Sequence, residues 1–470
     1  MIRLHDTLSG ETRPLVPLQA GHIGIYSCGP TVYGPAHIGN FRTFLGADLL
    51  VRYLRWRGLT VTWVMNITDV DDKIIRGAAA TGETIEELAD RYIATFLADA
   101  ATLRMTTPDV LPRATRHIDE MADLIATLLE RGHAYRTDDG SVFFRIASWP
   151  RYGELARLDP EGLRVGERVE ADEYGKDDVR DFALWKAPKP GEPVWETVIG
   201  PGRPGWHVEC SAMSMAQLGP SFDIHTGGVD LIFPHHEDEI AQSEAATGAT
   251  FVGTWLHSAH LQMGGTKMAK STGNIARVGE LVAAGMSPRA LRLALISVHY
   301  RAGLSQSDES LAAAASALDR LDTVVAALRA YRQAEGPDDS TLAGRLVAAN
   351  DAFIEAFDDD MNVSAGLAAL FELVRDLNRR IEGRSLSTAD AIRALETLAD
   401  LDRVLGILPD PDVELGPELT ALLDERAAAR SARDFAASDR LRDALAERGV
   451  IVEDTRDGQR WRRTEEADHG

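Results

Sequence analysis

The stretch HIGIYSCGPTVYGPAHIGN at residues 22–40 decides the fold of this chain. Its first seven residues are typical of a buried strand, and the glycines and prolines that follow are typical of a turn-rich loop. Residues 41–57 then place apolar side chains at helical spacing, and residues 59–67 (LTVTWVMNI) are rich in β-branched residues that favour strands. Strand, loop, helix and strand in this order predict a βαβ unit and hence a parallel sheet.

The rest of the sequence predicts further domains before and after this unit. The predicted fold class is α/β: a Rossmann-like parallel-sheet domain with an insertion, then an all-α helical bundle and a small mixed α/β module. The predicted ranges, in that order, are 1–115 and 206–260 for the two halves of the first domain, 116–205 for the insertion, 261–320 for a segment with a glycine- and lysine-containing loop, 321–408 for the bundle and 409–470 for the last module.

Helical periodicity gives finer expectations for the second half of the chain. Ala-rich amphipathic stretches at 307–334, 340–380 and 387–405 each predict helix. A charged stretch at 417–447 predicts a further helix, and the segments VIVEDT and QRWRR after it are expected to pair as a hairpin.

Composition excludes several classes of protein. The 470 residues are 44% hydrophobic and 26% charged, as in ordinary globular domains, and no apolar run reaches the roughly 18 residues of a membrane helix. The start MIRLHDTLSG has no basic stretch before an apolar core, so we expect no secretory signal and a cytoplasmic location. A net charge of −23 argues against a sequence-blind nucleic-acid binder, so any nucleic-acid surface must be local.

The segment His37-Ile38-Gly39-Asn40 lies where the first strand gives way to the first helix. Backbone N–H groups and the helix dipole favour phosphate at such a place, and Gly39 would let a ligand approach the backbone. His37 could donate to phosphate oxygens as charge develops. A glycine-containing turn after a strand is common, however, so this segment alone is a weak signal.

A second segment, Gly264-Gly265-Thr266-Lys267-Met268-Ala269-Lys270-Ser271, carries two lysines three residues apart. The glycines supply mobility, and the lysines can clamp a polyphosphate. A solvated basic surface loop is the simpler explanation for such a stretch taken by itself.

The chain has two cysteines, Cys28 and Cys210, which is too few for a disulfide framework. By count alone they are expected to be inert core thiols. His235 and Glu239 stand four residues apart on an expected helix, so they face one side, although a solvated ion pair would have the same spacing. Two thiolates, an imidazole and a carboxylate are together plausible ligands for Zn²⁺.

Several segments together resemble the cysteine-specific branch of the class I aminoacyl-tRNA synthetases. The two class signatures would be HIGN, with Asn40 where histidine is common, and KMAKS about 230 residues later. Further segments that resemble this family are YSCGPTVYGPAHIGN, NITDVDDKI, PGWHVECSAMS, FDIHTGGVDLIFPHHEDEIAQSEA, DDDMN and ASDRLRDALAERGVIVEDT. The resemblance covers nearly the whole chain.

The resemblance implies a function and a set of site residues. The chain would activate L-cysteine with ATP and transfer it to tRNA(Cys), using one Zn²⁺ to bind the substrate thiolate and Mg²⁺ with ATP; we expect a monomer. The implied residues are catalytic His37, Asn40, Lys267, Lys270 and Ser271; ATP-binding His37, Gly39, Gly228, Asp230, Met268 and Lys270; cysteine-binding Thr68, Trp206 and His225; metal-binding Cys28, Cys210, His235 and Glu239.

The module at 409–470 would bind the anticodon. It carries a basic cluster with one aromatic, suited to unstacked bases: Arg426, Arg430, Arg433, Arg440, Arg460, Trp461, Arg462 and Arg463. The resemblance names Arg430, Asp439 and Asp454 as base readers. Two alternatives remain open: a cysteine ligase of the mycothiol pathway, which would lack this tail, and a non-catalytic tRNA-binding paralogue, which would lack lysines or metal ligands.

Overall fold

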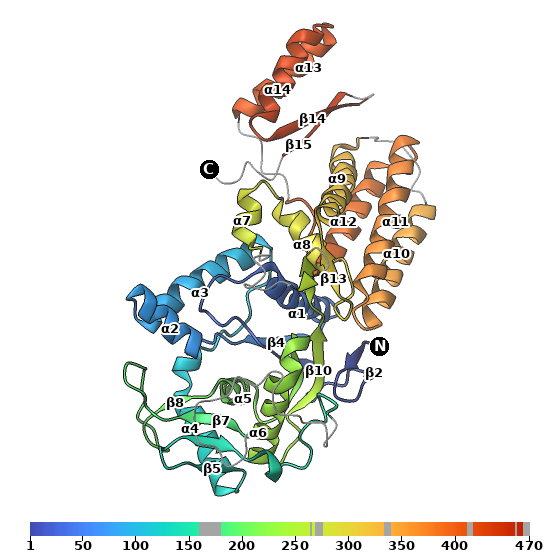
Figure 1. Cartoon of the computed structure of the whole chain (residues 1–470). Coiled ribbons are helices and arrows are strands. Elements are labelled where there is room, and N and C mark those ends of the chain that lie inside the picture. The colour runs from blue at the N-terminus through green and yellow to red at the C-terminus, as the bar shows by residue number, and fades with distance from the viewer. Residues whose placement is uncertain are drawn as a thin grey trace. The chain divides into compact units, whose positions relative to one another are not determined.

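The computed structural model describes residues 1–158, 180–263, 266–267, 276–332, 340–410, 417–455 and 458–463. The chain divides into two compact units (Figure 1). Unit 1 comprises Met1–Val278, His299–Ser305 and Asp358–Met361, and unit 2 comprises Gly279–Val298, Gln306–Phe357 and Asn362–Gly470. Within the described part of the chain, no helix combines the length and the hydropathy that a membrane crossing requires.

The centre of unit 1 is a parallel sheet with the strand order β10-β9-β3-β4. The predicted βαβ unit is present as β3 (His22–Ser27), α1 (Ile38–Trp56) and β4 (Thr60–Met65), and β9 (Phe222–Gly228) and β10 (Val252–Ser258) extend the sheet. Helix α1 begins at Ile38, three residues earlier than the apolar spacing indicated, because His37 caps it through its side chain. The parallel α/β fold is therefore confirmed.

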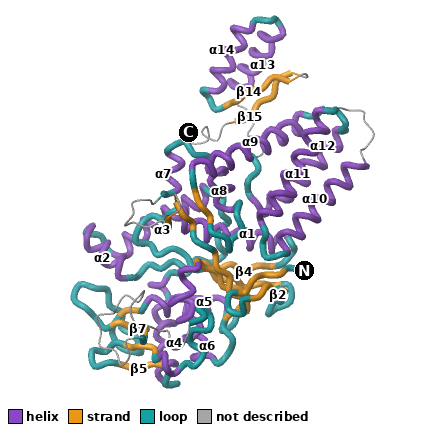
Figure 2. Tube along the Cα trace, turned by 45° about the vertical axis from the view of Figure 1, so that its right-hand side comes forward, coloured by secondary structure: helices purple, strands orange, loops and turns teal. Residues whose placement is uncertain are grey.

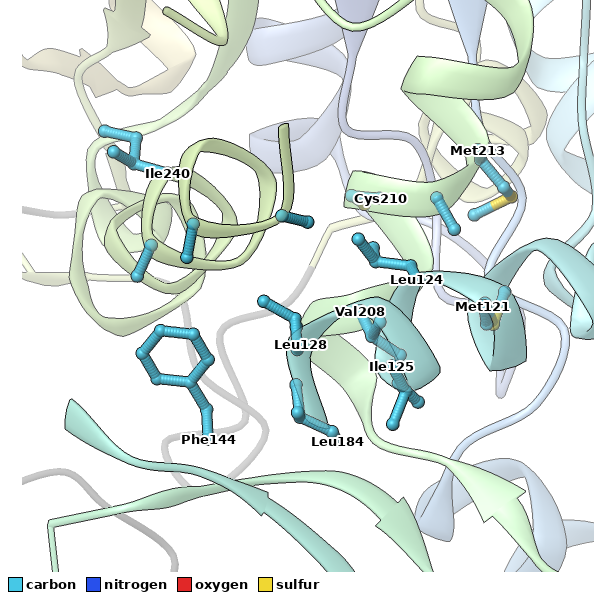
Figure 3. Close-up of a cluster of buried hydrophobic side chains, with 14 of the residues drawn as sticks. Met121, Leu124, Ile125, Leu128, Phe144, Leu184, Val208, Cys210, Met213 and Ile240 are labelled. Atoms are coloured by element: carbon cyan, nitrogen blue, oxygen red, sulfur yellow. The ribbon is translucent and has the colours of Figure 1, made fainter. Parts of the chain in front are cut away.

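Helices cover the sheet and form the main core of unit 1. Helices α4 (Ile118–Glu130), α5 (Trp206–Leu218) and α6 (Glu237–Thr247) lie together on one side of the sheet, with α1 on the other (Figure 2). Figure 3 shows Leu124 and Leu128 of α4 beside Val208 of α5, and Ile240 of α6 belongs to the same core cluster. Cys210 belongs to the same core, so α5 carries this thiol on a rigid, buried helix.

The remaining elements of unit 1 flank this core. Helices α2 (Asp72–Thr81) and α3 (Ile85–Thr102) follow β4, and the insertion holds an antiparallel sheet in the order β5-β6-β7-β8 (Ala134–Arg136, Val142–Phe144, Phe182–Lys186 and Arg203–Pro204). Two smaller sheets pair β1 (Arg3–Asp6) with β2 (Glu11–Pro14), and join β12 (Thr266–Lys267), β11 (Leu261–Met263) and β13 (Leu304–Gln306).

Unit 2 is helical apart from its last hairpin. Its helices are α7 (Val278–Ala283, which starts at the last residue of unit 1), α8 (Pro288–Ile296), α9 (Asp308–Ala330), α10 (Ser340–Asp358), α11 (Val363–Glu382), α12 (Thr388–Leu405), α13 (Pro417–Ser431) and α14 (Phe435–Ala446). The stretch expected as one helix at 340–380 is two, because Asp360 and Met361 adopt left-handed backbone conformations between α10 and α11. The expected helix at 417–447 likewise breaks at Arg433, which has a φ of 60°.

The C-terminal module is built as expected in its last part. Strands β14 (Val450–Thr455) and β15 (Gly458–Arg463) pair antiparallel, with Val452 opposite Trp461. Leu423, Leu445, Val450 and Val452 form its small core. The described part of this core contains four buried apolar residues, so the module depends strongly on its polar contacts.

Candidate active site and metal centre

Four residues from four segments of unit 1 converge on one buried point. Cys28 directly follows β3, Cys210 lies on α5, His235 lies in the short helical turn η4 (Ile232–His236), and Glu239 lies in the first turn of α6. One ligand atom from each lies within 4.8 Å of all the others, and no side chain of the four is more than 7% exposed. The residues proposed from sequence as metal ligands are thus brought together.

The distances within this group suit a metal ion rather than ordinary hydrogen bonding. The Cys28 and Cys210 sulfurs are 3.9 Å apart, and His235 Nε2 lies 3.4 Å from the Cys210 sulfur and 3.1 Å from Glu239 Oε1. Glu239 Oε1 is fully buried and accepts no hydrogen bond from a described residue. A buried carboxylate oxygen without a donor is costly, and a cation at this point would satisfy it. The donor set therefore fits a metal ion.

His236 is a possible ligand that sequence reasoning missed. Its Nε2 lies 3.3 Å from the Cys28 sulfur, and a second possible set consists of Cys28, His225, His236 and Glu239. His236 Nδ1 in turn lies 2.8 Å from His257 Nε2, which orients the ring. Adjacent residues on a regular helix point about 100° apart, so the pattern favoured only His235. In the structure the His235 and His236 rings lie with centroids 5.7 Å apart, the first next to the Cys210 sulfur and the second next to the Cys28 sulfur.

Burial controls the charge of this group in the metal-free chain. It raises the pKa of the Cys28 thiol and of the Glu239 carboxyl group well above their ordinary values. It lowers the pKa of His235 and His236 well below the ordinary value. The donors are therefore neutral without a cation, and binding a metal ion would displace protons from them.

Two neighbouring residues hold His235 in place. The Trp206 ring stacks on the His235 ring with centroids 4.3 Å apart, and His207 Nδ1 lies 2.9 Å from His235 Nδ1. Because Nδ1 is engaged by His207, Nε2 is the atom that faces Cys210. Trp206 is 39% exposed, which places it at the boundary between the buried group and solvent.

The HIGN segment forms the beginning of α1. His37 is the N-cap: its Nδ1 accepts from the Asn40 backbone N–H at 3.1 Å, and Asn40 Oδ1 accepts from the His37 N–H at 3.0 Å. This reciprocal cap explains why asparagine fits the fourth position. The backbone N–H of Ile38 donates to the Ala276 carbonyl, so the HIGN segment meets the chain just after the second signature.

The second signature is described only in part. Thr266 and Lys267 form β12, and Lys267 pairs with Gln262 of β11. Met268, Lys270 and Ser271, and both glycines before Thr266, lie outside the described residues. The roles of Lys267, Lys270 and Ser271 therefore stay predictions.

Of the residues expected to bind ATP, the described Gly39, Gly228 and Asp230 lie at the carboxyl edge of the parallel sheet. Gly228 ends β9, and Asp230 follows it with its side chain about half exposed and 3.8 Å from His260 Nδ1. Strands β3 and β9 are neighbours, so the segments after them, with Gly39 and Asp230, leave the same edge. Ligands of open α/β sheets bind at this edge. At Gly227, the residue before Gly228, the His236 ring takes the space that a side chain would need.

The three residues expected to bind cysteine differ in position. Trp206 borders solvent beside His235, whereas His225 is fully buried behind the metal group, with Nε2 3.0 Å from Glu239 Oε2. Thr68 exchanges backbone hydrogen bonds with the Pro30–Val32 segment and accepts from Asn66 Nδ2. The residue before that segment is Gly29, where any side chain would overlap the Asn66 carbonyl oxygen. Thr68 is thereby held close to Cys28.

The C-terminal module corrects part of the predicted nucleic-acid surface. Arg426 is 1% exposed and donates to both Asp454 carboxylate oxygens, at 3.0 and 3.1 Å, so it belongs to the interior of the module. Arg430 also pairs with Asp454 at 2.8 Å, while Asp439 pairs with Arg442 one turn along α14. Trp461 packs against the module's core. Of the three residues expected to read bases, Arg430 and Asp439 have the more exposed side chains.

The fold and this site together define a class I aminoacyl-tRNA synthetase. Residues 14–316 match the family described as tRNA synthetases class I (C) catalytic domain, residues 352–409 the DALR domain, and residues 412–462 the cysteinyl-tRNA ligase anticodon binding domain. Solved structures with the same fold include Mycobacterium tuberculosis methionyl-tRNA synthetase in complex with methionyl-adenylate (TM-score 0.59, 17% identity, 89% of this chain and 96% of that chain). A putative arginyl-tRNA synthetase from Campylobacter jejuni is another (TM-score 0.55, 13% identity, 82% and 93%).

The chain belongs to the cysteine–tRNA ligase family. It is 46% identical over 466 residues to the cysteine–tRNA ligase of Solibacter usitatus (98% of this chain, 99% of the relative). It is 47% identical over 473 residues to that of Alkalilimnicola ehrlichii (98% and 100%). The match of residues 412–462 to an anticodon-binding domain argues against the alternative of a cysteine ligase with an amino-sugar acceptor. The protein is thus a class I ligase whose partners are tRNA, ATP and an amino acid.

Proposed function

We propose that Cys28, Cys210, His235 and Glu239 hold one Zn²⁺ and that this site selects L-cysteine by its thiol. The observation that carries the proposal is the convergence of four buried donors within 4.8 Å, one of them a carboxylate oxygen with no hydrogen-bond donor. Two sulfurs, a nitrogen and an oxygen are a donor set typical of zinc. Bound there, the ion would supply a soft acceptor for a thiolate, which the less acidic serine hydroxyl cannot match.

Residues of the chain would position the other reactants. The N-terminus of α1 directs backbone N–H groups and its dipole toward the phosphates, and the reciprocal cap between His37 and Asn40 keeps that first turn formed. Asp230 would accept hydrogen bonds from the ribose hydroxyls. Lys267 and Lys270 would neutralise charge on the departing pyrophosphate, with Mg²⁺ bound to ATP.

The reaction then needs no covalent nucleophile from the protein. The substrate carboxylate attacks the α-phosphorus of ATP in line, pyrophosphate leaves, and a terminal ribose hydroxyl of tRNA(Cys) takes the aminoacyl group from the adenylate. Trp206, partly exposed beside His235, would close the amino-acid side of the site against water. We further propose that the enzyme acts as a monomer in the cytoplasm, which sedimentation and cell fractionation would test.

Glu239 is the ligand that we propose to bind most weakly. A fourth protein ligand normally closes a zinc site, and two thiolates with a carboxylate already exceed the charge of the ion. His225 competes for the same carboxylate at 3.0 Å. X-ray absorption of the zinc-loaded enzyme tests this: the sulfur count should rise from about two to about three when cysteine is added. An unchanged count would refute thiol ligation, and absence of bound zinc would refute the metal assignment.

A further inference from the structure

Glu209 is a buried carboxyl group that the reaction described above does not use. It is 1% exposed on α5, and its Oε2 makes no hydrogen bond to a described residue. No Lys, Arg or His among the described residues forms an ion pair with it. The carboxyl group accepts from Thr68, but its buried Oε2 has no donor, which is costly and calls for a group that the described part of the free chain does not supply.

Its surroundings place Glu209 between the metal centre and the segment after β3. It directly precedes Cys210 in α5, and the Thr68 hydroxyl donates to its carboxyl group. That hydroxyl accepts in turn from Asn66 Nδ2, and Asn66 Oδ1 accepts from the Gly29 N–H next to Cys28. This chain of hydrogen bonds links the carboxyl group of Glu209, the residue before Cys210, to the backbone N–H of the residue after Cys28.

The neighbouring acidic residues are satisfied, in contrast to Glu209. Asp69 pairs with Arg113 at 3.0 Å and accepts from Thr115. Asp71 caps α2 by accepting from the Lys73 and Ile74 N–H groups. Both raise the local negative potential, which favours a cation at Glu209.

We propose that Glu209 binds the α-ammonium group of the substrate amino acid. In cysteine only three bonds separate the sulfur from this nitrogen, so a thiol held at Cys28 and Cys210 brings the ammonium to the carboxyl group that precedes Cys210. The ammonium offers three N–H donors, enough for Glu209 Oε2 and further acceptors. This inference rests on the proposed thiol recognition by the metal centre.

The arrangement would give the enzyme a second criterion of selection. A soft metal distinguishes thiols from alcohols, but it accepts any small thiol that reaches it. An ammonium group can pair with this buried carboxyl group, whereas a thiol that lacks the amine leaves Oε2 without a hydrogen-bond partner. Glu209 would thus separate cysteine from thiol carboxylates of the same shape.

The test compares two thiols in zinc-loaded, full-length enzyme. Glu209→Gln should raise the KM for L-cysteine in ATP–pyrophosphate exchange roughly tenfold to hundredfold. The KM for ATP and the zinc content should stay unchanged. The inhibition constant of 3-mercaptopropionate, which lacks the amine, should change less than about twofold, whereas Glu209→Asp should recover part of the affinity for cysteine.

Glu244→Gln is a matched control, because Glu244 is also a buried carboxylate on the neighbouring helix α6 but pairs with Arg151 and the Phe251 N–H. It should leave the KM for cysteine unchanged. An equal loss of affinity for both thiols, or no loss for cysteine, would overturn the role of Glu209. If the metal proposal alone fails, the wild-type enzyme holds no zinc and does not bind 3-mercaptopropionate. The effect of Glu209→Gln on the KM for cysteine still tests whether Glu209 binds the ammonium group.

Discussion

His225 Nε2 lies 3.0 Å from Glu239 Oε2, and both side chains are fully buried. The His225 ring also stacks on Trp255 with centroids 4.6 Å apart, so it cannot swing away. His225 thereby fixes the carboxylate so that its other oxygen, Oε1, faces His235 and the sulfurs. A residue first considered for substrate contact instead orients a proposed metal ligand.

Replacing His225 by phenylalanine should weaken metal binding without removing a ligand of the proposed set. The aromatic ring would still stack on Trp255, but Glu239 would lose its orienting donor. Zinc affinity should fall roughly tenfold to hundredfold, the usual effect of removing such a partner. Competition with a chromophoric chelator measures this, with His133→Phe in the insertion as control. Unchanged zinc affinity would mean that Glu239 needs no orientation.

The two lysines of the second signature give a separate prediction, which rests on sequence. Lys270→Ala should slow ATP–pyrophosphate exchange by about two to three orders of magnitude, because positive charge on the developing pyrophosphate is lost. The melting temperature should barely change, because the role proposed for Lys270 is to bind phosphate rather than to stabilise the fold. Lys189→Ala, on the loop after β7, is the control. Exchange at the wild-type rate in Lys270→Ala would refute the role.

The sequence predicted the parallel sheet because its strands and first helix follow local periodicity. It also predicted that Cys28, Cys210, His235 and Glu239 lie together, since they stand in recognisable segments, while their binding of zinc stays a prediction. The position of His236 in this group was not predicted, because helical spacing relates His235 to Glu239 and does not indicate the residue next to it. The break between α10 and α11 was missed for a similar reason: left-handed Asp360 and Met361 are held by tertiary contacts, which periodicity does not record.

The ion pair between buried Arg426 and Asp454 was also beyond sequence reasoning, because a helical arginine is usually solvated. Arg426→Met should destabilise the module by about 1–2 kcal/mol, since the module loses two hydrogen bonds while Asp454 stays partly exposed and keeps Arg430 as a partner. The exposed Arg430→Met should cost less than about 1 kcal/mol. Hydrogen exchange of the backbone amides of residues 417–463 measures the difference in stability between the two variants.

The same pair of variants separates folding from tRNA binding. Both should keep ATP–pyrophosphate exchange, which uses unit 1. Arg430→Met should raise the KM for tRNA while leaving the module protected, if Arg430 contacts the anticodon as proposed. Equal protection of the module in both variants would contradict the structural role of Arg426.

Asp99, half-buried on α3, gives the last prediction. Burial raises its pKa to about 6 from an ordinary value of 3.8. The folded state therefore binds this proton more tightly than the unfolded state between those two values. The stabilising contribution is complete below pH 3.8 and is lost as the pH rises through 6.

Asp99→Asn should consequently raise the free energy of unfolding at pH 8, where the wild-type carboxylate is ionised, and change it little near pH 4. The gain should not exceed about 1 kcal/mol, because the half-buried group remains partly screened by solvent. Denaturant unfolding at both pH values measures it, and Asp90→Asn on the same helix is the control: it breaks the pair with Arg113 and should not stabilise the protein. An equal effect of Asp99→Asn at both pH values would show that the amide acts through packing rather than through the proton.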